Sequence, residues 1–404
     1  MITSLRGMND ILNKDDYTRF TYFIETATTI AKRYGFHFIE TPILEETALF
    51  KRSVGESSDI VGKEMYQFED KGGNDVCMRP EGTAGVVRAF IQNKLDRAGG
   101  THRFFYHGSM FRYERPQKGR LRQFHQFGVE SFGQESVYED ATMIMMVADI
   151  LKALGIGYRL QLNSLGCKEC MPPYRENLVK FIESVEDAIC EDCQRRKTTN
   201  PIRVLDCKNE KCQSLYENAP KLINSLCESC ESDFSKLKTI LDANGIAYEI
   251  DTNLVRGLDY YSKTAFEFVS DNIGSQSAIA GGGRYDRLVE FLDGRATPAV
   301  GFAMGIERLM ELIEMPQEQR DGYYLGAMDA EAVELIISLT QKKRQSSKAT
   351  CEYRSRNLKA HLKNADKANA RYCCVIGSNE FENKTIWVKD LLEKTEETIS
   401  LEDF

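Results

Sequence analysis

FFYHGSMFRYERPQKGRLRQFHQFGVESF, residues 104–132, alternates aromatic with polar side chains on both sides of a short basic turn. Successive side chains of a strand point to opposite faces, so residues two apart share a face. One face of the first strand carries Phe104, Tyr106, Gly108, Met110, Arg112 and Glu114. The return strand adds Phe124, Gln126, Gly128, Glu130 and Phe132. The stretch therefore predicts a β-hairpin with one face that is both aromatic and charged.

The opposite face of this hairpin is apolar, so both faces are expected to be substantially buried. It carries Phe105, Phe111, Tyr113, His125, Phe127 and Val129. A lone arginine on a strand usually faces water, but a buried arginine or glutamate requires a partner or a ligand. Gly128 leaves open space between Gln126 and Glu130. We therefore expect this hairpin to form the floor of a nucleotide-binding active site.

The turn of the hairpin, residues 115–122, holds four cations and no acid. These are Arg115, Lys118, Arg120 and Arg122. Like charges at this density repel one another unless phosphates neutralise them. The turn is therefore expected to contact a polyphosphate or an RNA end.

The whole chain has the size and composition of a multidomain globular protein. Its 404 residues exceed one typical core, and 42% apolar with 28% charged residues are ordinary values. It lacks an apolar run long enough to span a bilayer, and its N-terminus lacks a secretory signal. Twelve cysteines then suggest reduced thiols or metal ligands, and a net charge of −8 argues against indiscriminate nucleic-acid binding. We expect a cytoplasmic protein without a membrane partner.

Periodicity divides the chain into segments. Apolar residues three and four apart predict an amphipathic helix over residues 17–34, ending near Gly35. Residues 165–245 are helical, polar and cysteine-rich, as an inserted subdomain would be, and strand signals resume near Leu254. Strands and a helix beyond Gly322 predict a separate small α/β unit.

Three further segments supply polar groups and glycines that suit a binding site. Residues 254–261 combine Arg256 with paired tyrosines, and residues 280–286 begin with a glycine run that lets backbone approach a substrate. Residues 298–305 predict a buried strand, followed by a helix with Arg308 in its first turn. A cation in the first turn is unfavourable, because it lies at the positive end of the helix dipole. An anionic ligand bound by Arg308 would explain this position. The alternative is a surface ion pair with a neighbouring glutamate.

Taken in order, these segments resemble the class II aminoacyl-tRNA synthetases. Residues 42–55, 111–133 and 301–309 are similar to the three motifs of that class, the first of which builds a dimer interface. Residues 254–261 and 280–286 resemble the two segments peculiar to histidine enzymes of the bacterial type. The resemblance covers nearly the whole chain and implies ligation of histidine to its tRNA.

The resemblance also implies an α+β fold and a division into domains. A catalytic domain with an antiparallel sheet flanked by helices would span residues 1–320, interrupted by a helical insertion at about 165–245. An α/β anticodon-binding domain would span residues 322–404. The protein would be a homodimer that uses ATP with Mg²⁺, L-histidine and tRNA(His).

Roles for individual residues follow from the same resemblance. ATP would be bound by Arg112, Glu114, Arg120, Phe124 and Arg308. Histidine would be bound by Glu81, Thr83, Gln126, Glu130, Tyr260 and Tyr261. The tRNA acceptor end would meet Gln117, Lys118 and Arg122. Arg256 and Arg112 would be catalytic, converging on the α-phosphate as the histidine carboxylate attacks it to form an adenylate.

The imidazole of histidine fits such a site, because a carboxylate such as Glu130 and a phenol such as Tyr261 can pair both ring nitrogens.

Two rival classes of protein remain. A noncatalytic, synthetase-like regulatory subunit of ATP phosphoribosyltransferase would lack the catalytic arginines and the last domain. An RNA-binding module without activity would not need the charged hairpin.

The last domain offers a second RNA contact. Residues 342–371 hold ten basic and two acidic side chains, a local balance of about +8. A solvated helix face could account for some of this charge. The resemblance assigns this domain to the anticodon.

Cysteine pairs gather in the insertion, at Cys167/Cys170, Cys190/Cys193, Cys207/Cys212 and Cys227/Cys230. Paired spacing suits tetrahedral structural zinc, while cysteine is also a common small core residue. No catalytic metal residue is assigned, and zinc on these cysteines stays an open possibility.

Overall fold

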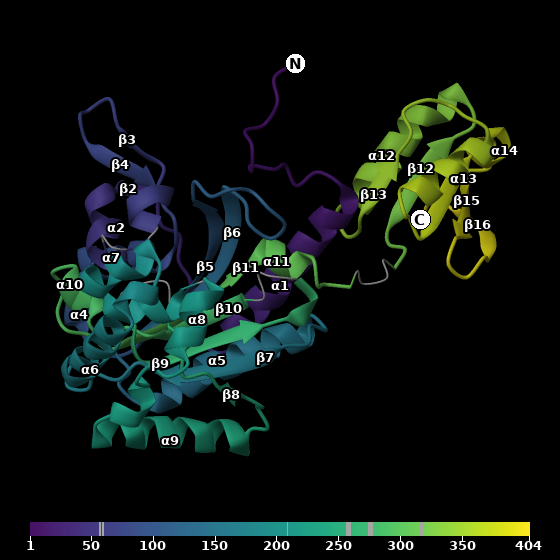
Figure 1. Cartoon of the computed structure of the whole chain (residues 1–404). Coiled ribbons are helices and arrows are strands. Elements are labelled where there is room, and N and C mark those ends of the chain that lie inside the picture. The colour runs from purple at the N-terminus through teal and green to yellow at the C-terminus, as the bar shows by residue number, and fades with distance from the viewer. Residues whose placement is uncertain (56–57, 59, 208, 256–259, 274–277, 315–318) are drawn as a thin grey trace. The chain divides into compact units, whose positions relative to one another are not determined.

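The computed structural model describes residues 1–55, 58, 60–207, 209–255, 260–273, 278–314 and 319–404. They form two compact units, Met1–Met315 and Pro316–Phe404 (Figure 1). Within the described part of the chain, no helix is long and apolar enough to cross a membrane.

The first unit is built on an eight-stranded sheet whose central strands run antiparallel, with parallel pairs near its two edges. In spatial order it consists of β1 (His37–Phe38), β5 (His102–Phe111), β6 (Gln123–Phe132), β11 (Ala299–Gly305), β10 (Ala278–Arg284), β9 (Ser262–Val269), β7 (Arg159–Ser164) and β8 (Glu249–Ile250). The predicted α+β fold with an antiparallel sheet is confirmed. The predicted hairpin is β5 and β6, with Phe104 opposite Glu130.

Both faces of the hairpin are buried, as its sequence predicts, but they belong to different cores. Phe105, Phe127 and Val129 pack in the main core with α1 (Lys14–Arg33) and α5 (Val137–Ala153). On the other face, Tyr106, Met110 and Phe132 pack against α3 (Thr83–Gln92) and the chain around Tyr285. This second face is the one that carries Glu130.

Helix α1 follows from local sequence. The Asn13 side chain accepts the Asp16 N–H at 2.9 Å, and acidic residues in the first turn and basic residues in the last complement the helix dipole. The helix ends as predicted, because Gly35 adopts φ +82° directly after it. Phe23, Ala27 and Ile30 form its buried stripe.

The insertion between β7 and β8 is helical. It comprises α6 (Met171–Ser184), α7 (Glu191–Thr199), α8 (Glu210–Tyr216) and α9 (Glu228–Ala243). Helix α9 lies alongside α5 (Figure 1), and its residues Phe234, Leu237 and Leu241 join the main core. The other three helices enclose a small core of their own around Tyr174 and Leu178.

Smaller elements complete the first unit. A three-stranded sheet contains β2 (Leu44–Glu46), β4 (Asp75–Met78) and β3 (Gln67–Glu69). The remaining α-helices are α2 (Thr47–Val54), α3 (Thr83–Gln92), α4 (Leu95–Ala98), α10 (Leu288–Phe291) and α11 (Ile306–Met310). Short 3₁₀ or π turns occupy Ile60–Glu64, Glu186–Ala188, Pro201–Asp206, Leu222–Ser225 and Asp271–Ile273.

The second unit is a five-stranded mixed sheet with helices. Its strands are, in spatial order, β13 (Ala349–Cys351), β12 (Tyr323–Ala327), β14 (Tyr372–Ile376), β15 (Thr385–Asp390) and β16 (Glu396–Ser400). Its helical elements are Ala330–Ala332, α12 (Val333–Lys343), α13 (Leu358–Lys367) and α14 (Ser378–Glu382). The three strands and the helix predicted beyond Gly322 are present.

A buried ion pair ties the glycine-rich strand β10 to α5. The side chains of Arg284 and Asp140 are 2% and 0% exposed, and the guanidinium contacts both carboxylate oxygens. It also donates to Gln134 O at 2.8 Å, to Ser136 O at 3.2 Å and to Asp286 Oδ1 at 3.1 Å. Because the Arg284 guanidinium donates to groups of the protein itself, this residue has a structural role.

We predict that Asp140→Asn destabilises the first unit by about 3–5 kcal/mol, because it leaves a buried guanidinium short of its main counter-charge. The measurement is urea unfolding followed by circular dichroism. Asp293→Asn is the matched control, since Asp293 pairs with Arg52 at 2.8 Å on the exposed surface. Equal midpoints for the two variants would contradict the structural role of the Arg284–Asp140 pair.

Candidate active site

A buried carboxylate, Glu130, lies at the centre of the site on β6 and is 1% exposed. It accepts hydrogen bonds from the Thr83 hydroxyl at 2.7 Å, from the Tyr106 hydroxyl at 3.3 Å and from the Tyr285 hydroxyl. An ionised carboxylate offers about four acceptor positions. Three are used by the protein, which leaves room for a donor from a ligand.

Two glycines make space for these side chains. A Cβ at Gly128 would lie 2.2 Å from Tyr106 Cζ, and a Cβ at Gly301 would lie 2.0 Å from Glu130 Oε2. Any larger residue at either position would displace Tyr106 or Glu130. The open space predicted at Gly128 is therefore filled in part by the Tyr106 ring.

A second buried carboxylate, Glu81, caps helix α3. It accepts the Thr83 N–H at 2.7 Å and the Ala84 N–H at 2.9 Å. The sequence Glu81-Gly82-Thr83 starts a helix, as predicted, and the same turn brings the Thr83 hydroxyl to Glu130. Burial raises the pKa of Glu81, and the two backbone donors oppose that shift.

Burial also raises the pKa of Glu130, to about 8. The hydrogen bonds from Tyr285 and Thr83 lower this pKa, but burial has the larger effect. Two buried carboxylates close together disfavour each other's charge, and Glu81 adds to the rise in the pKa of Glu130. Such a pair favours a ligand that carries N–H donors or positive charge.

Two further polar atoms of the site are shielded from water. The Tyr260 hydroxyl and Gln126 Oε1 are both buried, and among the described residues neither has a hydrogen-bond partner at normal distance. The Tyr260 ring lies 4.7 Å from Tyr261 and 5.6 Å from Tyr285. A buried acceptor or hydroxyl without a partner costs free energy, which a polar ligand would recover.

Next to the carboxylates, the charges of three arginines, Arg112, Arg120 and Arg308, act on one another. Arg112 Nε donates to Pro80 O at 2.9 Å, and its guanidinium lies 5.2 Å from the centre of the Phe124 ring. Arg308 donates to Gly119 O at 2.9 Å and to Ala278 O at 2.7 Å.

The charges in this cluster act on one another. The pKa of Arg308 is lowered by burial and then by the nearby charges of Arg120 and Arg112. Converging cations of this kind suit a polyphosphate ligand. Helix α11 begins directly after strand β11, as predicted, and this junction places Arg308 among them.

The basic turn is less self-repelling than its sequence predicts. Arg120 pairs with Glu114 at 2.6 Å, and Lys118 pairs with Glu311 at 3.0 Å. Arg122 lies 3.8 Å from the centre of the Tyr113 ring. The expectation that only phosphate could neutralise these charges is wrong, because acids outside the turn already do so for two of them.

The glycine run at 280–286 lies largely within the sheet, and the expected approach of its backbone to a substrate stays a prediction. It forms β10, in the interior of the sheet, paired with β9 and β11. A Cβ at Gly282 would lie 2.2 Å from Gly301 O and 2.7 Å from Phe266 Cζ. Gly282 therefore faces a neighbouring strand and an aromatic ring of the protein, whereas a Cβ at Gly283 would lie 3.0 Å from Tyr261 Cδ1.

The structure thus gathers Glu81, Thr83, Gln126, Glu130 and Tyr260 near one end of the hairpin face. Arg112, Glu114, Arg120, Phe124 and Arg308 lie toward the turn. Gln117 and Lys118 are exposed in that turn, and Arg122 is half-buried. Arg256 and residues 257–259 lie outside the described residues, so the expected catalytic role of Arg256 stays a prediction.

Two residues of the site have no role in the sequence prediction. Tyr106 lies on the predicted face, and its register opposite Gly128 could have indicated that its ring fills that space. Tyr285 reaches Glu130 from 155 residues away, and no local pattern predicts this contact.

Side chains that could hold a metal ion occur in the insertion. Two groups of four cysteines lie there with their sulfur atoms close together. They are separate from the carboxylates and arginines of the hairpin. The groups of the hairpin provide carboxylate and hydroxyl acceptors beside a cluster of cations.

Comparison with known proteins agrees with this geometry. The family model described as histidyl-tRNA synthetase matches residues 7–309, and the anticodon binding domain matches residues 323–404. The antiparallel sheet, the charged hairpin and the anticodon-binding domain together define a class II aminoacyl-tRNA synthetase, an enzyme of the ligase type.

Histidine–tRNA ligase of Sulfurimonas denitrificans is 78% identical over the full length of both chains. The apo histidyl-tRNA synthetase of S. aureus superimposes with a TM-score of 0.83 at 37% identity, covering 100% of this chain and 98% of that one. This chain therefore belongs to the histidyl-tRNA synthetase family.

A Bacillus halodurans structure described as an ATP phosphoribosyltransferase regulatory subunit/histidyl-tRNA synthetase has a TM-score of 0.65 at 21% identity. It covers 90% of this chain and 96% of that chain. At this identity the likeness shows a shared fold.

The raised pKa of Glu130 predicts a pH dependence of stability. Between the ordinary value of 4.5 and about 8, the folded state keeps a proton that the unfolded chain has lost. The free energy of unfolding of the wild type, relative to Glu130→Gln, should fall as pH rises through this window and then level off. Urea unfolding at several pH values measures this difference. A difference that is constant from pH 4.5 to 8 would refute the shifted pKa.

Proposed function

We propose that this chain ligates L-histidine to tRNA(His) through a histidyl-adenylate, using ATP with Mg²⁺. The observation that carries the proposal is the hairpin β5–β6, which places a buried carboxylate with free acceptor capacity beside converging arginines. One half of this face suits a small cationic or N–H-bearing ligand. The other half suits a polyphosphate, and the reaction joins ligands of these two kinds.

Histidine recognition would centre on Glu130. Its remaining acceptor position suits one imidazole N–H, and Tyr261 would pair with the other ring nitrogen. Gln126, whose Oε1 is buried without a partner among the described residues, would take the amino group together with Glu81 and Thr83. An amino acid with an apolar side chain would leave these groups unpaired, a penalty that can reach about 10⁴–10⁵ in selectivity.

ATP would lie along the Arg112 half of the hairpin. Phe124 would stack on adenine, Arg112 would hold the α-phosphate, and Arg308 would bind the γ-phosphate. Glu114 and Arg120 are already paired with each other at 2.6 Å, so their role would be to shape the nucleotide pocket as one unit. Mg²⁺ would neutralise charge on the leaving pyrophosphate.

Adenylate formation would be an attack of the histidine carboxylate on the α-phosphorus, with release of pyrophosphate. Negative charge grows on the phosphoryl oxygens during this step, and cations held in place beforehand stabilise it. Arg112 from the hairpin and Arg256 would supply that charge. The acyl group would then pass to the terminal ribose of the tRNA.

The tRNA would meet the chain at two surfaces. The exposed Gln117 and Lys118, with Arg122 beside them, would contact the acceptor end. On α13, the exposed Lys359, Lys363 and Lys367 recur every fourth residue, opposite the buried His361 and Ala365. These lysines form one row, and a row of one sign suits an RNA backbone at the anticodon.

The noncatalytic regulatory subunit is the weaker candidate. It predicts loss of the phosphate-binding arginines, whereas Arg112 and Arg308 are present and lie in the site. The matched anticodon-binding domain over residues 323–404 also favours the ligase. A homodimer through residues 42–55 and a cytoplasmic location belong to the same proposal and remain predictions.

ATP–pyrophosphate exchange with each of the twenty amino acids tests the proposal. We expect exchange with histidine alone to rise clearly above the background. Exchange that is equal for histidine and for the other amino acids would exclude the function. A regulatory subunit would give no exchange with any of them.

Two arginine substitutions separate ATP binding from chemistry. Arg308→Ala should raise the KM for ATP by about ten- to a hundredfold, because a hydrogen bond to a charged group contributes about 1.5–3 kcal/mol. Arg256→Ala should lower the rate of adenylate formation more than it weakens ATP binding. Arg159→Ala is the control, since Arg159 pairs with Asp271 on the exposed surface, away from the hairpin. Wild-type exchange kinetics in Arg308→Ala or Arg256→Ala would refute the role assigned to that residue.

A further inference from the structure

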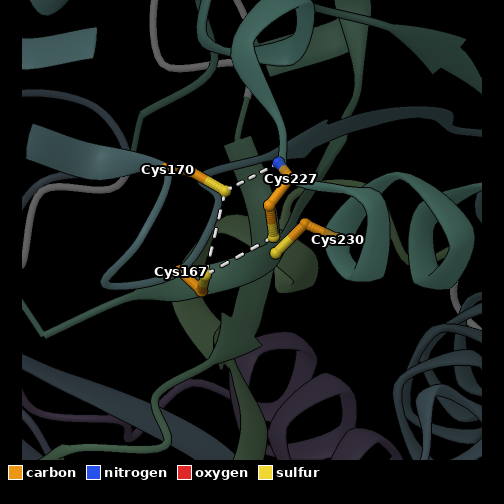
Figure 2. A group of neighbouring side chains, drawn as sticks. All are labelled: Cys167, Cys170, Cys227 and Cys230. Carbon is orange, nitrogen blue, oxygen red and sulfur yellow. Dashed lines mark hydrogen bonds between the residues drawn. The ribbon is translucent and has the colours of Figure 1, made fainter. Parts of the chain in front are cut away.

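The insertion gathers its cysteines into two sets of four. The first set, here called site 1, is Cys167, Cys170, Cys227 and Cys230 (Figure 2). The second, site 2, is Cys190, Cys193, Cys207 and Cys212. Within each set all sulfur atoms lie within 4.8 Å of one another. We propose that each set binds one structural zinc ion.

The sulfur spacing matches a tetrahedral metal site. With a Zn–S bond of about 2.3 Å, the corners of a tetrahedron are about 3.8 Å apart. In site 1 the Cys167 sulfur lies 3.8 Å from the sulfurs of Cys170 and Cys227. In site 2 the sulfurs of Cys190 and Cys207 are 3.7 Å apart.

The backbone around both sites donates hydrogen bonds to sulfur, which stabilises thiolates and orients metal ligands. In site 1 the Cys227 N–H donates to the Cys170 sulfur at 3.1 Å, a contact drawn as a dashed line in Figure 2. The Glu169 N–H donates to the Cys167 sulfur at 3.4 Å. In site 2 the Cys190 N–H lies 3.2 Å from the Cys212 sulfur.

Both sites are built in the same way from a cysteine pair at a helix start. Cys227 precedes α9 and Cys230 lies in its first turn, while Cys190 precedes α7 and Cys193 lies in its first turn. The positive end of a helix stabilises a nearby thiolate. Two sequence-distant segments thus supply four thiolates to one point in each case.

Disulfides, core packing and an iron–sulfur cluster fit these cysteines less well than zinc does. A disulfide has sulfurs about 2.05 Å apart and joins only two of them, and all twelve cysteines are free in the structure. Cysteines that only fill a core need not meet in fours. The remaining four, Cys77, Cys351, Cys373 and Cys374, belong to neither set. A four-iron cluster needs room for its irons and sulfides inside the ligand set, which sulfurs within 4.8 Å do not leave.

Site 1 connects the insertion to the catalytic sheet. Cys167 follows the end of β7, where the Leu165 N–H donates to Lys263 O at 2.6 Å and the Lys263 N–H donates to Gly166 O at 2.7 Å. Lys263 is two residues beyond Tyr261. A metal ion in site 1 would therefore fix the start of β9, next to the tyrosine proposed to contact the imidazole. Site 2 lies within the insertion and would stabilise it alone.

Metal analysis of the full chain tests the proposal. The protein should be purified without a histidine tag and without chelators, and analysed by plasma mass spectrometry. We expect about two zinc ions per chain. Less than a tenth of an equivalent of zinc would overturn the proposal, and iron in place of zinc would overturn the choice of metal.

Serine variants assign the two ions to their sites. Cys230→Ser and Cys193→Ser should each lose about one equivalent of zinc, from site 1 and site 2. Cys351→Ser is the matched control, because Cys351 is a half-buried cysteine outside both sets, and it should keep both ions. Zinc content that is unchanged in Cys230→Ser or in Cys193→Ser would refute the corresponding site.

A second measurement needs only the wild-type protein, in case the variants fail to fold. X-ray absorption at the zinc edge should give about four sulfur neighbours at about 2.3 Å and no nitrogen or oxygen. Oxygen or nitrogen ligands would refute thiolate sites even if zinc is present. Both readouts are independent of catalysis, so they can fail while the proposed ligase function holds.

The effect of site 1 on Tyr261 rests on the proposed function and has its own readout. Cys230→Ser should raise the KM for histidine in pyrophosphate exchange more than the KM for ATP. Cys193→Ser should change the ratio of the histidine KM to the ATP KM less. Equal effects of both variants on the two KM values would remove the link between site 1 and the histidine pocket while leaving the zinc assignment intact.

Discussion

The burial of Glu130 constrains every other part of the site. A carboxylate that is 1% exposed needs hydrogen-bond donors, and the fold supplies them from α3, from β5 and from the chain after β10. Three segments must therefore approach the Glu130 side chain on β6 before a ligand binds. The same packing requires glycine at positions 128 and 301. The Tyr106 ring occupies the space that a side chain at 128 would need, and the Glu130 carboxylate occupies the space that one at 301 would need.

The cationic half of the site is organised differently. Arg120 is paired with Glu114, and Arg112 and Arg308 donate to backbone carbonyl groups, so the guanidinium groups are held in position before a phosphate arrives. Preorganised charge of this kind lowers a barrier because little reorganisation accompanies the reaction. The buried Arg284–Asp140 pair holds β10 against α5.

Much of this arrangement follows from short-range sequence patterns. Alternation over residues 104–132 predicts the hairpin and both of its buried faces, and Glu81-Gly82-Thr83 predicts the start of α3. The contacts that complete the site are long-range, however, and local patterns do not encode them. Tyr285 meets Glu130 across 155 residues, and the partner of Lys118 is the distant Glu311. The division of eight cysteines into two sets likewise depends on how the insertion folds.

If this chain selects histidine as proposed, Glu130 is the anchor for the imidazole. A crystal structure of the chain soaked with histidine would show whether it is. We expect an imidazole nitrogen within hydrogen-bonding distance of the Glu130 carboxylate, with Thr83 and Tyr285 still donating to the same group. An imidazole bound away from Glu130, or a carboxylate whose acceptor positions are all used by protein donors in the complex, would contradict this role.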